Sequence, residues 1–252
     1  GAVVMTGLTS VTFRHLSPSE IIRLAQKANM DGIEWGGDIH VPAGDKPTAK
    51  IVKEQTMHAG LQVFSYGSYY RLSENARWRA ALEPVLQSAA ALGAPVVRIW
   101  AGELGSAQTT PHLREKLLHN LCESCKMAQD YGLSLALEYH QNTLTDTAES
   151  TLHLLQQANC KNLSTYWQTN PDLLTEAHIQ EITLLLPYIS NIHVFNWGKG
   201  DIRLPLKSGL ENWKKYFSLL NCKARNYIME FVRNDSAGQF LEDAAFLKDI
   251  TT

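Results

Sequence analysis

Short apolar runs alternate along the chain with longer segments whose apolar residues recur at helical spacing. There are eight such pairs, and the apolar runs start 26 to 38 residues apart. This spacing fits one strand, one loop and one helix per unit, and strands buried on both faces should be continuously apolar. The predicted strands are residues 3–10, 32–35, 61–66, 95–102, 133–139, 163–167, 189–195 and 226–232.

The segments between these strands carry helix-start and helix-stop signals. Ser17 precedes Pro18 and an amphipathic run, as a capping serine does. Gly60, Gly93 and Gly132 each stand just before a strand, where a glycine in the left-handed conformation commonly ends a helix. The pattern therefore predicts a strand–helix unit repeated eight times.

The number of units favours a closed barrel. Eight units in 252 residues is the usual size of a (β/α)₈ TIM barrel, whereas an open doubly wound sheet more often has fewer units and a glycine-rich first turn. No GxGxxG motif follows the first strand, and no linker rich in Pro, Gly or Ser divides the chain. We predict an α/β fold with a single TIM-barrel domain over residues 1–252.

Composition and charge argue against two classes of binding partner, nucleic acids and membranes. The chain has 23 Lys and Arg against 25 Asp and Glu, and no basic run of five residues, so a nucleic-acid partner is not expected. No apolar stretch approaches the roughly 20 residues of a membrane helix, and no charged-then-apolar leader opens the sequence. We expect a cytoplasmic protein without a membrane partner, and the oligomeric state is not predicted.

Four cysteines are present, and two of them form a CxxC motif, Cys122 and Cys125. This motif lies within a helical pattern, and no second CxxC completes a set of four zinc ligands. Ordinary reduced thiols are the expectation.

Polar residues interrupt or end several apolar strands, at the edge where TIM barrels place their active sites. They are Glu34, Arg98, Glu138, His140, Gln168, His193 and Glu230. An unpaired buried carboxylate costs several kcal/mol, so Glu138 and Glu230 require compensation. A buried ion pair with Arg98 is one explanation for either residue, and a bound cation is the other.

The four residues from strands five to eight favour the cation when taken together. Glu138, Gln168, His193 and Glu230 offer carboxylate, amide and imidazole donors, which suit a hard divalent ion. We expect one divalent metal ion, with Mn²⁺ first and Mg²⁺, Co²⁺ or Zn²⁺ as alternatives. His193 alone would more often be a hydrogen-bonded core histidine, so this expectation depends on its neighbours.

The residues that follow the strands supply candidate substrate contacts. Trp35, Tyr66 and Trp100 are either core residues or aromatic walls for a polyol. His140 fits a substrate contact, a partner of a metal ligand or a plain loop residue. Arg203, beyond strand seven, is a candidate for binding a phosphate or carboxylate through its planar guanidinium, with a solvated loop arginine as the alternative.

Several segments resemble a known family. LALEYHQNTLTDTAES, GIEWGGDIHVPAGD, VVRIWAGELGS, NIHVFNW and YIMEFVRNDS are similar to segments of the xylose isomerase-like sugar phosphate isomerases and epimerases, over nearly the whole chain. The resemblance implies a barrel with a divalent metal held by strands five to eight, with two Glu ligands also acting as acid and base. By position, Glu138, His193 and Glu230 match these ligands, and His40 joins the substrate-binding candidates.

The chain departs from the family pattern near strand six. Gln168 stands where relatives usually have Asp, Pro171 where they have His, and Asn196 where many have Asp after the strand-seven His. Replacing Asp by Gln168 keeps an oxygen ligand but removes one negative charge. We therefore expect weaker metal binding and a more electrophilic metal.

These observations predict a metal-dependent isomerase or epimerase of a small sugar, ketose or sugar phosphate. Glu138 and Glu230 would transfer protons through an enediolate. One alternative is a lyase that dehydrates its substrate at the same site, as inosose dehydratase-like relatives do. Another is a non-catalytic sugar binder whose metal site is weakened by Gln168. A metal-dependent endonuclease on a similar barrel is disfavoured by the near-neutral charge and the small number of ligands.

Overall fold

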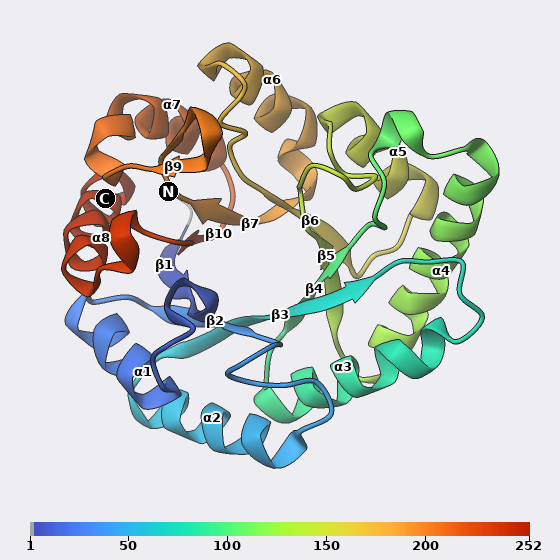
Figure 1. Cartoon of the computed structure of the whole chain (residues 1–252), viewed down its shortest axis with the longest axis horizontal. Helices are drawn as coiled ribbons and strands as arrows, with labels where there is room; N and C mark the ends of the chain where they lie inside the picture. Colours follow the sequence, from blue (N-terminus) through green and yellow to red (C-terminus); the bar gives the residue numbers. More distant parts are fainter. Residues whose placement is uncertain (1–2) are drawn as a thin grey trace.

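The computed structural model describes residues 3–252, so positions 1 and 2 of the predicted domain lie outside the described residues. Eight parallel strands close into a barrel in the order β1–β10–β7–β6–β5–β4–β3–β2. Figure 1 shows the helices forming a ring around these strands. The predicted (β/α)₈ barrel is confirmed.

All eight predicted strands are present. They are β1 (Val4–Thr9), β2 (Gly32–Gly36), β3 (Gln62–Arg71), β4 (Val96–Trp100), β5 (Ser134–Leu137), β6 (Leu163–Trp167), β7 (Ile189–Val194) and β10 (Arg225–Met229). The strand ends differ from the prediction in two ways that affect the site. β3 continues to Arg71, and β5 and β10 end one residue before Glu138 and Glu230. A short hairpin of β8 (Trp197–Gly198) and β9 (Ile202–Arg203) was not predicted.

Eight helices alternate with the barrel strands. They are α1 (Pro18–Lys27), α2 (Lys46–His58), α3 (Trp78–Leu92), α4 (Pro111–Asp130), α5 (Ala148–Ala158), α6 (Thr175–Leu185), α7 (Leu210–Leu220) and α8 (Ala237–Thr251). Ser17 forms a capping box with Glu20 at the start of α1, and Gly93 ends α3 with φ of 74°. The local signals read from the sequence therefore act as predicted.

Two further findings concern the helices. No helix within residues 3–252 combines the length and the apolar composition that crossing a bilayer requires. Cys122 and Cys125 lie in α4, and all four cysteines of the chain are free thiols, as expected.

The barrel interior changes from apolar to polar along its axis. Phe64, Ala136, Tyr166 and Ile228 form a buried cluster inside the barrel. Because side chains at i and i+2 of a strand share a face, Ala136 and Ile228 lie one layer below Glu138 and Glu230. An apolar layer therefore forms the floor beneath the charged side chains at the C-terminal end.

Two glycines make room for this floor. Gly7 of β1 and Gly32 of β2 are register partners, and the ring of Phe64 packs against both. A Cβ added at Gly32 would lie 2.4 Å from the Phe64 ring and 2.7 Å from the carbonyl oxygen of Gln62. Gly32 thus allows the closest approach of β2 to the phenylalanine that seals the barrel.

We predict that Gly32→Ala lowers the free energy of unfolding by about 1–3 kcal/mol, because the added methyl group must displace Phe64 or the backbone. Gly238→Ala is the matched control, since a Cβ there meets only Ser236 Oγ at 3.6 Å and alanine is the better helix former. Urea unfolding of both variants measures the difference. Equal stability of the two variants would contradict the packing role of Gly32.

Candidate active site

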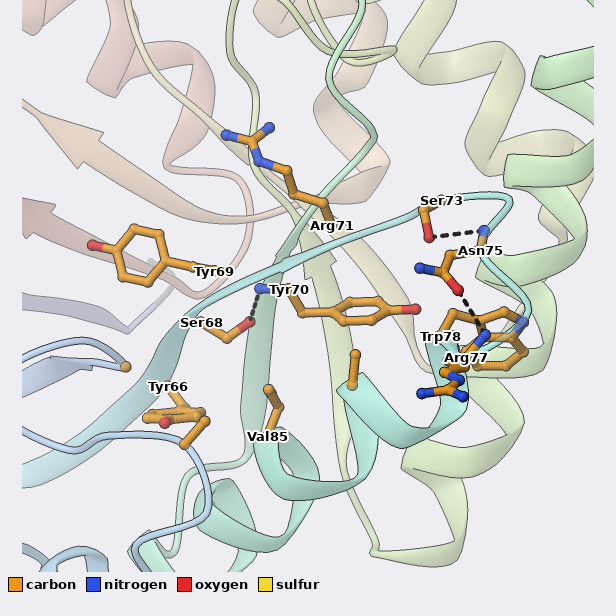
Figure 2. Close-up of a pocket in the computed structure, with 13 residues that line it drawn as sticks. Tyr66, Ser68, Tyr69, Tyr70, Arg71, Ser73, Asn75, Arg77, Trp78 and Val85 are labelled. Atoms are coloured by element: carbon orange, nitrogen blue, oxygen red, sulfur yellow. Dashed lines mark hydrogen bonds between the residues drawn. The ribbon is translucent and has the colours of Figure 1, made fainter.

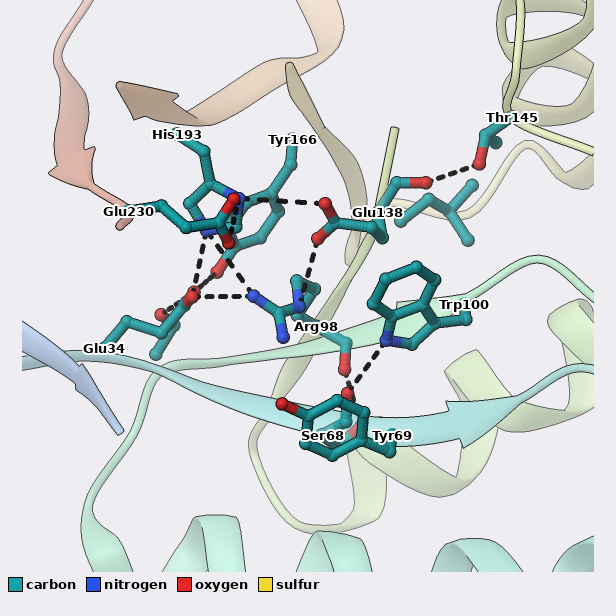
Figure 3. A network of polar contacts seen from close by, with 12 residues as sticks. Glu34, Ser68, Tyr69, Arg98, Trp100, Glu138, Thr145, Tyr166, His193 and Glu230 are labelled. Carbon is teal, nitrogen blue, oxygen red and sulfur yellow. Dashed lines mark hydrogen bonds and ion pairs between the residues drawn. The ribbon is translucent and has the colours of Figure 1, made fainter. Parts of the chain in front are cut away.

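Five ionisable side chains meet at the C-terminal end of the barrel (Figure 3). They come from β2, β4, β7 and the positions that follow β5 and β10: Glu34, Arg98, His193, Glu138 and Glu230. Their side chains are 0%, 3%, 0%, 3% and 13% exposed, respectively. We call these five residues the charged cluster. Glu230 is its most accessible member.

Glu34 connects the two cationic members of the cluster. Its Oε1 accepts hydrogen bonds from Arg98 Nη1 at 2.8 Å and from His193 Nε2 at 2.9 Å. Its Oε2 accepts from the hydroxyls of Ser65, at 2.7 Å, and Tyr166. The pKa of Glu34 stays well below its usual range because the charges of Arg98 and His193 outweigh the effect of burial. Glu34 is therefore a buried carboxylate that orients both partners.

The bond to Glu34 determines which side of His193 faces the cavity. With Nε2 directed to Glu34, Nδ1 lies 3.3 Å from Glu230 Oε2 and 3.7 Å from Glu138 Oε1. Burial alone would lower the pKa of His193, but the surrounding charges of Glu230, Glu34 and Glu138 raise it to about 10. A protonated imidazole would balance part of the carboxylate charge, and a cation bound at Nδ1 would take the place of that proton.

Glu138 and Glu230 occupy different electrostatic environments. Burial favours the neutral form of both residues, but Arg98 Nε lies 3.1 Å from Glu138 Oε2 and holds the pKa of Glu138 below its usual range. Burial dominates at Glu230 and raises its pKa. The buried ion pair that the sequence left open is therefore present, formed by Arg98 with Glu34 and Glu138 together.

The backbone after β10 places Glu230. Its amide donates to the carbonyl of Val194 at 3.1 Å, which continues the barrel pairing one residue beyond the strand. The next residue, Phe231, has φ of 59°, an uncommon conformation for a bulky residue, and its amide donates to Thr12 Oγ1 at 3.2 Å. The chain thus turns sharply just after Glu230.

Gln168 follows β6 directly and lines a cavity of about 280 Å³ together with His140 and Trp197. Its Oε1 is buried and has no hydrogen-bond partner. The loops that follow β5, β6 and β7 form this cavity, and no member of the charged cluster lines it. The structure therefore places Gln168 at the same end of the barrel as the charged cluster.

The donor atoms allow a test of the expected cation. Within residues 3–252, no group of three or more His, Cys, Asp or Glu side chains is arranged to hold a metal ion. Several buried atoms of the described residues lack a hydrogen-bond partner, and three of them belong to the expected ligands. They are His193 Nδ1, Gln168 Oε1 and Glu138 Oε2, the last of which lies 3.1 Å from Arg98 Nε without hydrogen-bond geometry. An imidazole nitrogen and two oxygens are donors that fit a hard divalent ion.

Trp100 and His140 lie beside the cluster. Their rings are 5.3 Å apart in an edge-on arrangement, and the Arg98 guanidinium lies 5.8 Å from the Trp100 ring. Figure 3 shows Trp100 next to Arg98 and Glu138. Because His140 is exposed and Trp100 is half-buried, both are accessible from the barrel mouth. The structure thus brings Arg98, Trp100 and His140 together, as a substrate site requires.

Three other substrate-binding candidates are buried in the wall of the barrel. Trp35, His40 and Tyr66 are at most 4% exposed, and their polar atoms bond within the protein. Trp35 donates to Thr56 Oγ1 at 3.1 Å, His40 contacts Ser10 Oγ at 3.0 Å and the Leu16 carbonyl at 2.8 Å, and Tyr66 donates to the Val41 carbonyl at 2.6 Å. Strand-end aromatics can face either side of a barrel wall, and these pack away from the cluster.

Arg203 lies beyond β8 on the hairpin. Its Nη1 contacts Asp235 Oδ1 at 2.5 Å, and its guanidinium stacks on the Phe231 ring at 4.5 Å. Its charge is therefore already paired with a carboxylate.

A second cavity lies between β3 and α3 (Figure 2). It measures about 330 Å³ and is lined by residues that include Tyr66, Tyr70, Trp78 and Val85. No member of the charged cluster lines it. The candidate active site is therefore the barrel mouth and not this side cavity.

The sequence matches the family of xylose isomerase-like TIM barrels over residues 22–250. Because this match covers most of the chain, the protein belongs to that family.

Two similar proteins of Bacillus anthracis are described as dehydratases. A 3-dehydroshikimate dehydratase of Bacillus anthracis is 25% identical over 211 residues, which cover 77% of this chain and 72% of the relative. The crystal structure of the probable 3-DHS dehydratase involved in petrobactin synthesis from Bacillus anthracis is 20% identical, with a TM-score of 0.84 and coverage of 98% and 99%.

Two other solved structures share the fold. D-psicose 3-epimerase from Clostridium cellulolyticum, solved with D-tagatose, is 14% identical with a TM-score of 0.72, covering 98% of each chain. A xylose isomerase-like TIM barrel protein from Mycobacterium smegmatis, solved in complex with magnesium, is 15% identical with a TM-score of 0.67, covering 98% and 96%. The chain is thus similar to enzymes that modify small sugar-like compounds.

Glu181 of α6 lines the same cavity as Gln168 and was not predicted as a site residue. It is 9% exposed and accepts a hydrogen bond from the Tyr139 hydroxyl. Burial raises the pKa of Glu181 to about 7. An acidic residue in the middle of a helix carries no sequence signal that distinguishes this position from a solvated one.

We predict that Glu181→Gln changes the pH dependence of stability. A carboxyl pKa that folding raises from 4.5 to about 7 contributes stability that is complete below pH 4.5 and is lost as pH rises through 7. Glutamine keeps an acceptor for Tyr139 but does not ionise. The free energy of unfolding of the variant, taken relative to that of wild type, should therefore be higher above pH 7 than at pH 4.5 by on the order of 1–3 kcal/mol. Exposed Glu54→Gln is the control, and parallel curves for wild type and Glu181→Gln would contradict the assignment.

Proposed function

We propose that this chain is a divalent-metal-dependent enzyme that removes a proton next to a carbonyl group of a small polyhydroxylated substrate. The observation that supports this proposal most strongly is the pair of carboxyl groups that flank His193. Glu138 and Glu230 approach Nδ1 within 3.7 and 3.3 Å from strands on either side of β7 in the barrel. Two carboxyl groups at one cavity provide a base and an acid.

Their contacts suggest different roles. Arg98 pairs with Glu138 and keeps it ionised, so Glu138 is the proposed base. Within residues 3–252, no Lys or Arg nitrogen lies within 4.0 Å of the Glu230 carboxyl, so Glu230 is the proposed acid. His193 and Glu34 hold the two carboxyl groups and Arg98 in place.

The residues proposed to hold the metal are Glu138, Gln168, His193 and Glu230. Two observations support this set. Both carboxyl groups approach His193 Nδ1, and the buried Oε1 of Gln168 has no hydrogen-bond partner among the described residues. A bound divalent ion supplies Lewis-acid polarisation of the substrate carbonyl and stabilises the negative charge that follows proton removal. Mn²⁺ remains the first candidate, and the magnesium bound by a protein of the same fold supports a hard divalent ion.

Dehydration is the reaction that the relatives favour. Two similar proteins of Bacillus anthracis are described as dehydratases of 3-dehydroshikimate. One is 25% identical in sequence, and the other is the solved structure with a TM-score of 0.84. In such a step Glu138 would take the proton from carbon, and the C–H electrons would form a carbon–carbon double bond as the β-hydroxyl leaves. Glu230 would protonate the departing hydroxyl, which gives water.

Isomerisation or epimerisation is the second candidate and was the first expectation from the sequence. It uses the same proton removal, but Glu230 returns a proton to carbon and no water is lost. The approach of two carboxyl groups to His193 Nδ1, from strands on either side of β7, supports it, since a two-base epimerase needs such a pair.

We expect Glu138→Gln and Glu230→Gln each to reduce turnover by about 10²- to 10⁴-fold without loss of the fold, because each removes one proton-transfer group. Proton NMR with 3-dehydroshikimate and, separately, unphosphorylated and phosphorylated ketoses distinguishes dehydration from epimerisation. Glu54→Gln, on the exposed face of α2, should keep wild-type turnover. Full activity in either site variant would exclude the proposed acid–base pair, and inactivity of the wild type on all compounds would favour a binding protein.

We expect dialysis against a chelator to abolish turnover and Mn²⁺ to restore it. Gln168→Asp should tighten Mn²⁺ binding by roughly 10-fold in calorimetry, because an anionic oxygen replaces a neutral one. Gln141→Asp is the matched control, since exposed Gln141 lines the same cavity. An equal gain in both variants, or no saturable binding to either, would contradict a role for Gln168 as a ligand.

A further inference from the structure

Three arginines at the C-terminal end of the barrel are paired with carboxylates. Arg14 binds Asp38 at 2.8 Å, Arg98 binds Glu34 and Glu138, and Arg203 binds Asp235. Arg71 differs from these three. Within residues 3–252, no carboxylate oxygen lies within 4.0 Å of its guanidinium, and its one side-chain hydrogen bond is from Nη1 to the Gly102 carbonyl at 2.8 Å.

Arg71 is the last residue of β3, and its register partner is Trp100 at the end of β4. Its guanidinium carbon lies 4.7 Å from the centre of the Trp100 ring. Trp100 is itself fixed, because its Nε1 donates to the Ser68 carbonyl at 3.1 Å. A guanidinium stacked on an anchored indole is held in a defined position at little further entropic cost.

The side chain of Arg71 borders the side cavity between β3 and α3, but it leaves β3 on the face that is turned toward the barrel mouth. In Figure 2 it leaves β3 on the side opposite to Val85, as Tyr69 does, whereas Tyr70 points toward α3. Figure 3 places Trp100 next to Arg98 and Glu138 of the charged cluster. The direction of Arg71 agrees with the alternation of side chains along a strand, which puts Tyr69 and Arg71 on one face.

Trp100 therefore links three cationic or hydrogen-bonding groups. The ring lies 4.7 Å from Arg71, 5.8 Å from Arg98 and 5.3 Å from the imidazole of His140. Arg98 is neutralised by two carboxylates. Arg71 therefore contributes an uncompensated positive charge beside the Trp100 ring. Glu74 and Glu103 line a neighbouring cavity with Arg71 but lie beyond ion-pair distance.

We infer that Arg71, Trp100 and His140 form an oxyanion subsite that binds a carboxylate or phosphate group of the substrate. Nη2 and Nε of Arg71 have no hydrogen-bond acceptor within the described chain and form the fork that planar oxyanions accept. The identification of the anion as part of a substrate rests on the proposed function. The binding of an anion by Arg71, Trp100 and His140 does not rest on that function.

Binding of inorganic phosphate, and separately of acetate, tests the subsite directly. Arginine Nε–Hε signals of the full chain are followed by NMR, and the Arg71 signal is assigned by its loss in Arg71→Lys. A saturable shift of this signal is expected in the millimolar range. The indole Nε1–Hε1 signal of Trp100, whose ring lies 4.7 Å from the Arg71 guanidinium carbon, reports binding in the variants. Arg71→Gln should weaken binding by about 10-fold or more, because it removes a charge-assisted hydrogen-bonding group.

Arg77→Gln is the matched control. Arg77 is exposed and borders the same side cavity as Arg71, but it lies beyond β3 in the segment that leads into α3. It should bind phosphate as the wild type does. An equal loss of affinity in both variants, or no saturable shift at Arg71, would overturn the subsite.

Steady-state kinetics separates this inference from the proposed function. With a substrate that carries the anion, Arg71→Gln should raise KM by about 10- to 100-fold with kcat changed only a few-fold, and Arg71→Lys should recover part of the loss. 3-Dehydroshikimate and a phosphorylated ketose distinguish a carboxylate from a phosphate. An unchanged KM with an active substrate would refute the subsite alone. Anion binding at Arg71 without any turnover would support the subsite and refute the proposed function.

Discussion

The candidate site depends on one buried contact, the carboxylate of Glu34 between Arg98 and His193. A carboxylate with no exposed surface would be costly without partners, and Glu34 has four hydrogen-bond donors from four other strands. This contact fixes the ring of His193 so that Nδ1 faces Glu138 and Glu230. It also holds Arg98 where its Nε reaches Glu138. The orientation of the proposed catalytic groups therefore follows from a residue that itself lies beneath the cavity.

The apolar layer and the charged layer of the barrel interior have different roles. The apolar floor of Phe64, Ala136, Tyr166 and Ile228 excludes water from below, while the charged cluster lies directly above it. Tyr166 belongs to both layers, because its ring packs in the floor and its hydroxyl bonds Glu34. Low polarity beneath the cluster strengthens the electrostatic interactions within it. The same property makes the cluster sensitive to the loss of any one charge.

The strand pattern was sufficient to predict the barrel, because each buried strand is a continuous apolar run with a recognisable helix on either side. It also predicted the convergence of Glu138, His193 and Glu230, since the ends of parallel strands meet at one edge. The role of Glu34 was missed although it interrupts an apolar strand as Glu138 does. Its partner His193 is 159 positions away in sequence, and nothing local indicates that distance in space.

Local geometry explains the other differences. Trp35 and Tyr66 were expected to contact the substrate, and both are buried with their polar atoms bonded within the protein. A side chain one position earlier or later on a strand faces the opposite side. Arg71 was missed because the strand was expected to end at Tyr66, whereas β3 continues to Arg71 and carries that side chain to the mouth. Gln168 could be located from sequence, but whether its oxygen is a ligand depends on geometry that the family likeness does not supply.

We propose above all that Glu138, Gln168, His193 and Glu230 bind one divalent cation at the mouth of the barrel. Anomalous diffraction from crystals grown with Mn²⁺ tests it most directly. We expect a single strong anomalous peak, with His193 Nδ1 and oxygens of the other three residues about 2.0–2.4 Å from it. A peak bound elsewhere, or none at saturating Mn²⁺ with His193 Nδ1 still directed at Glu230, would contradict it.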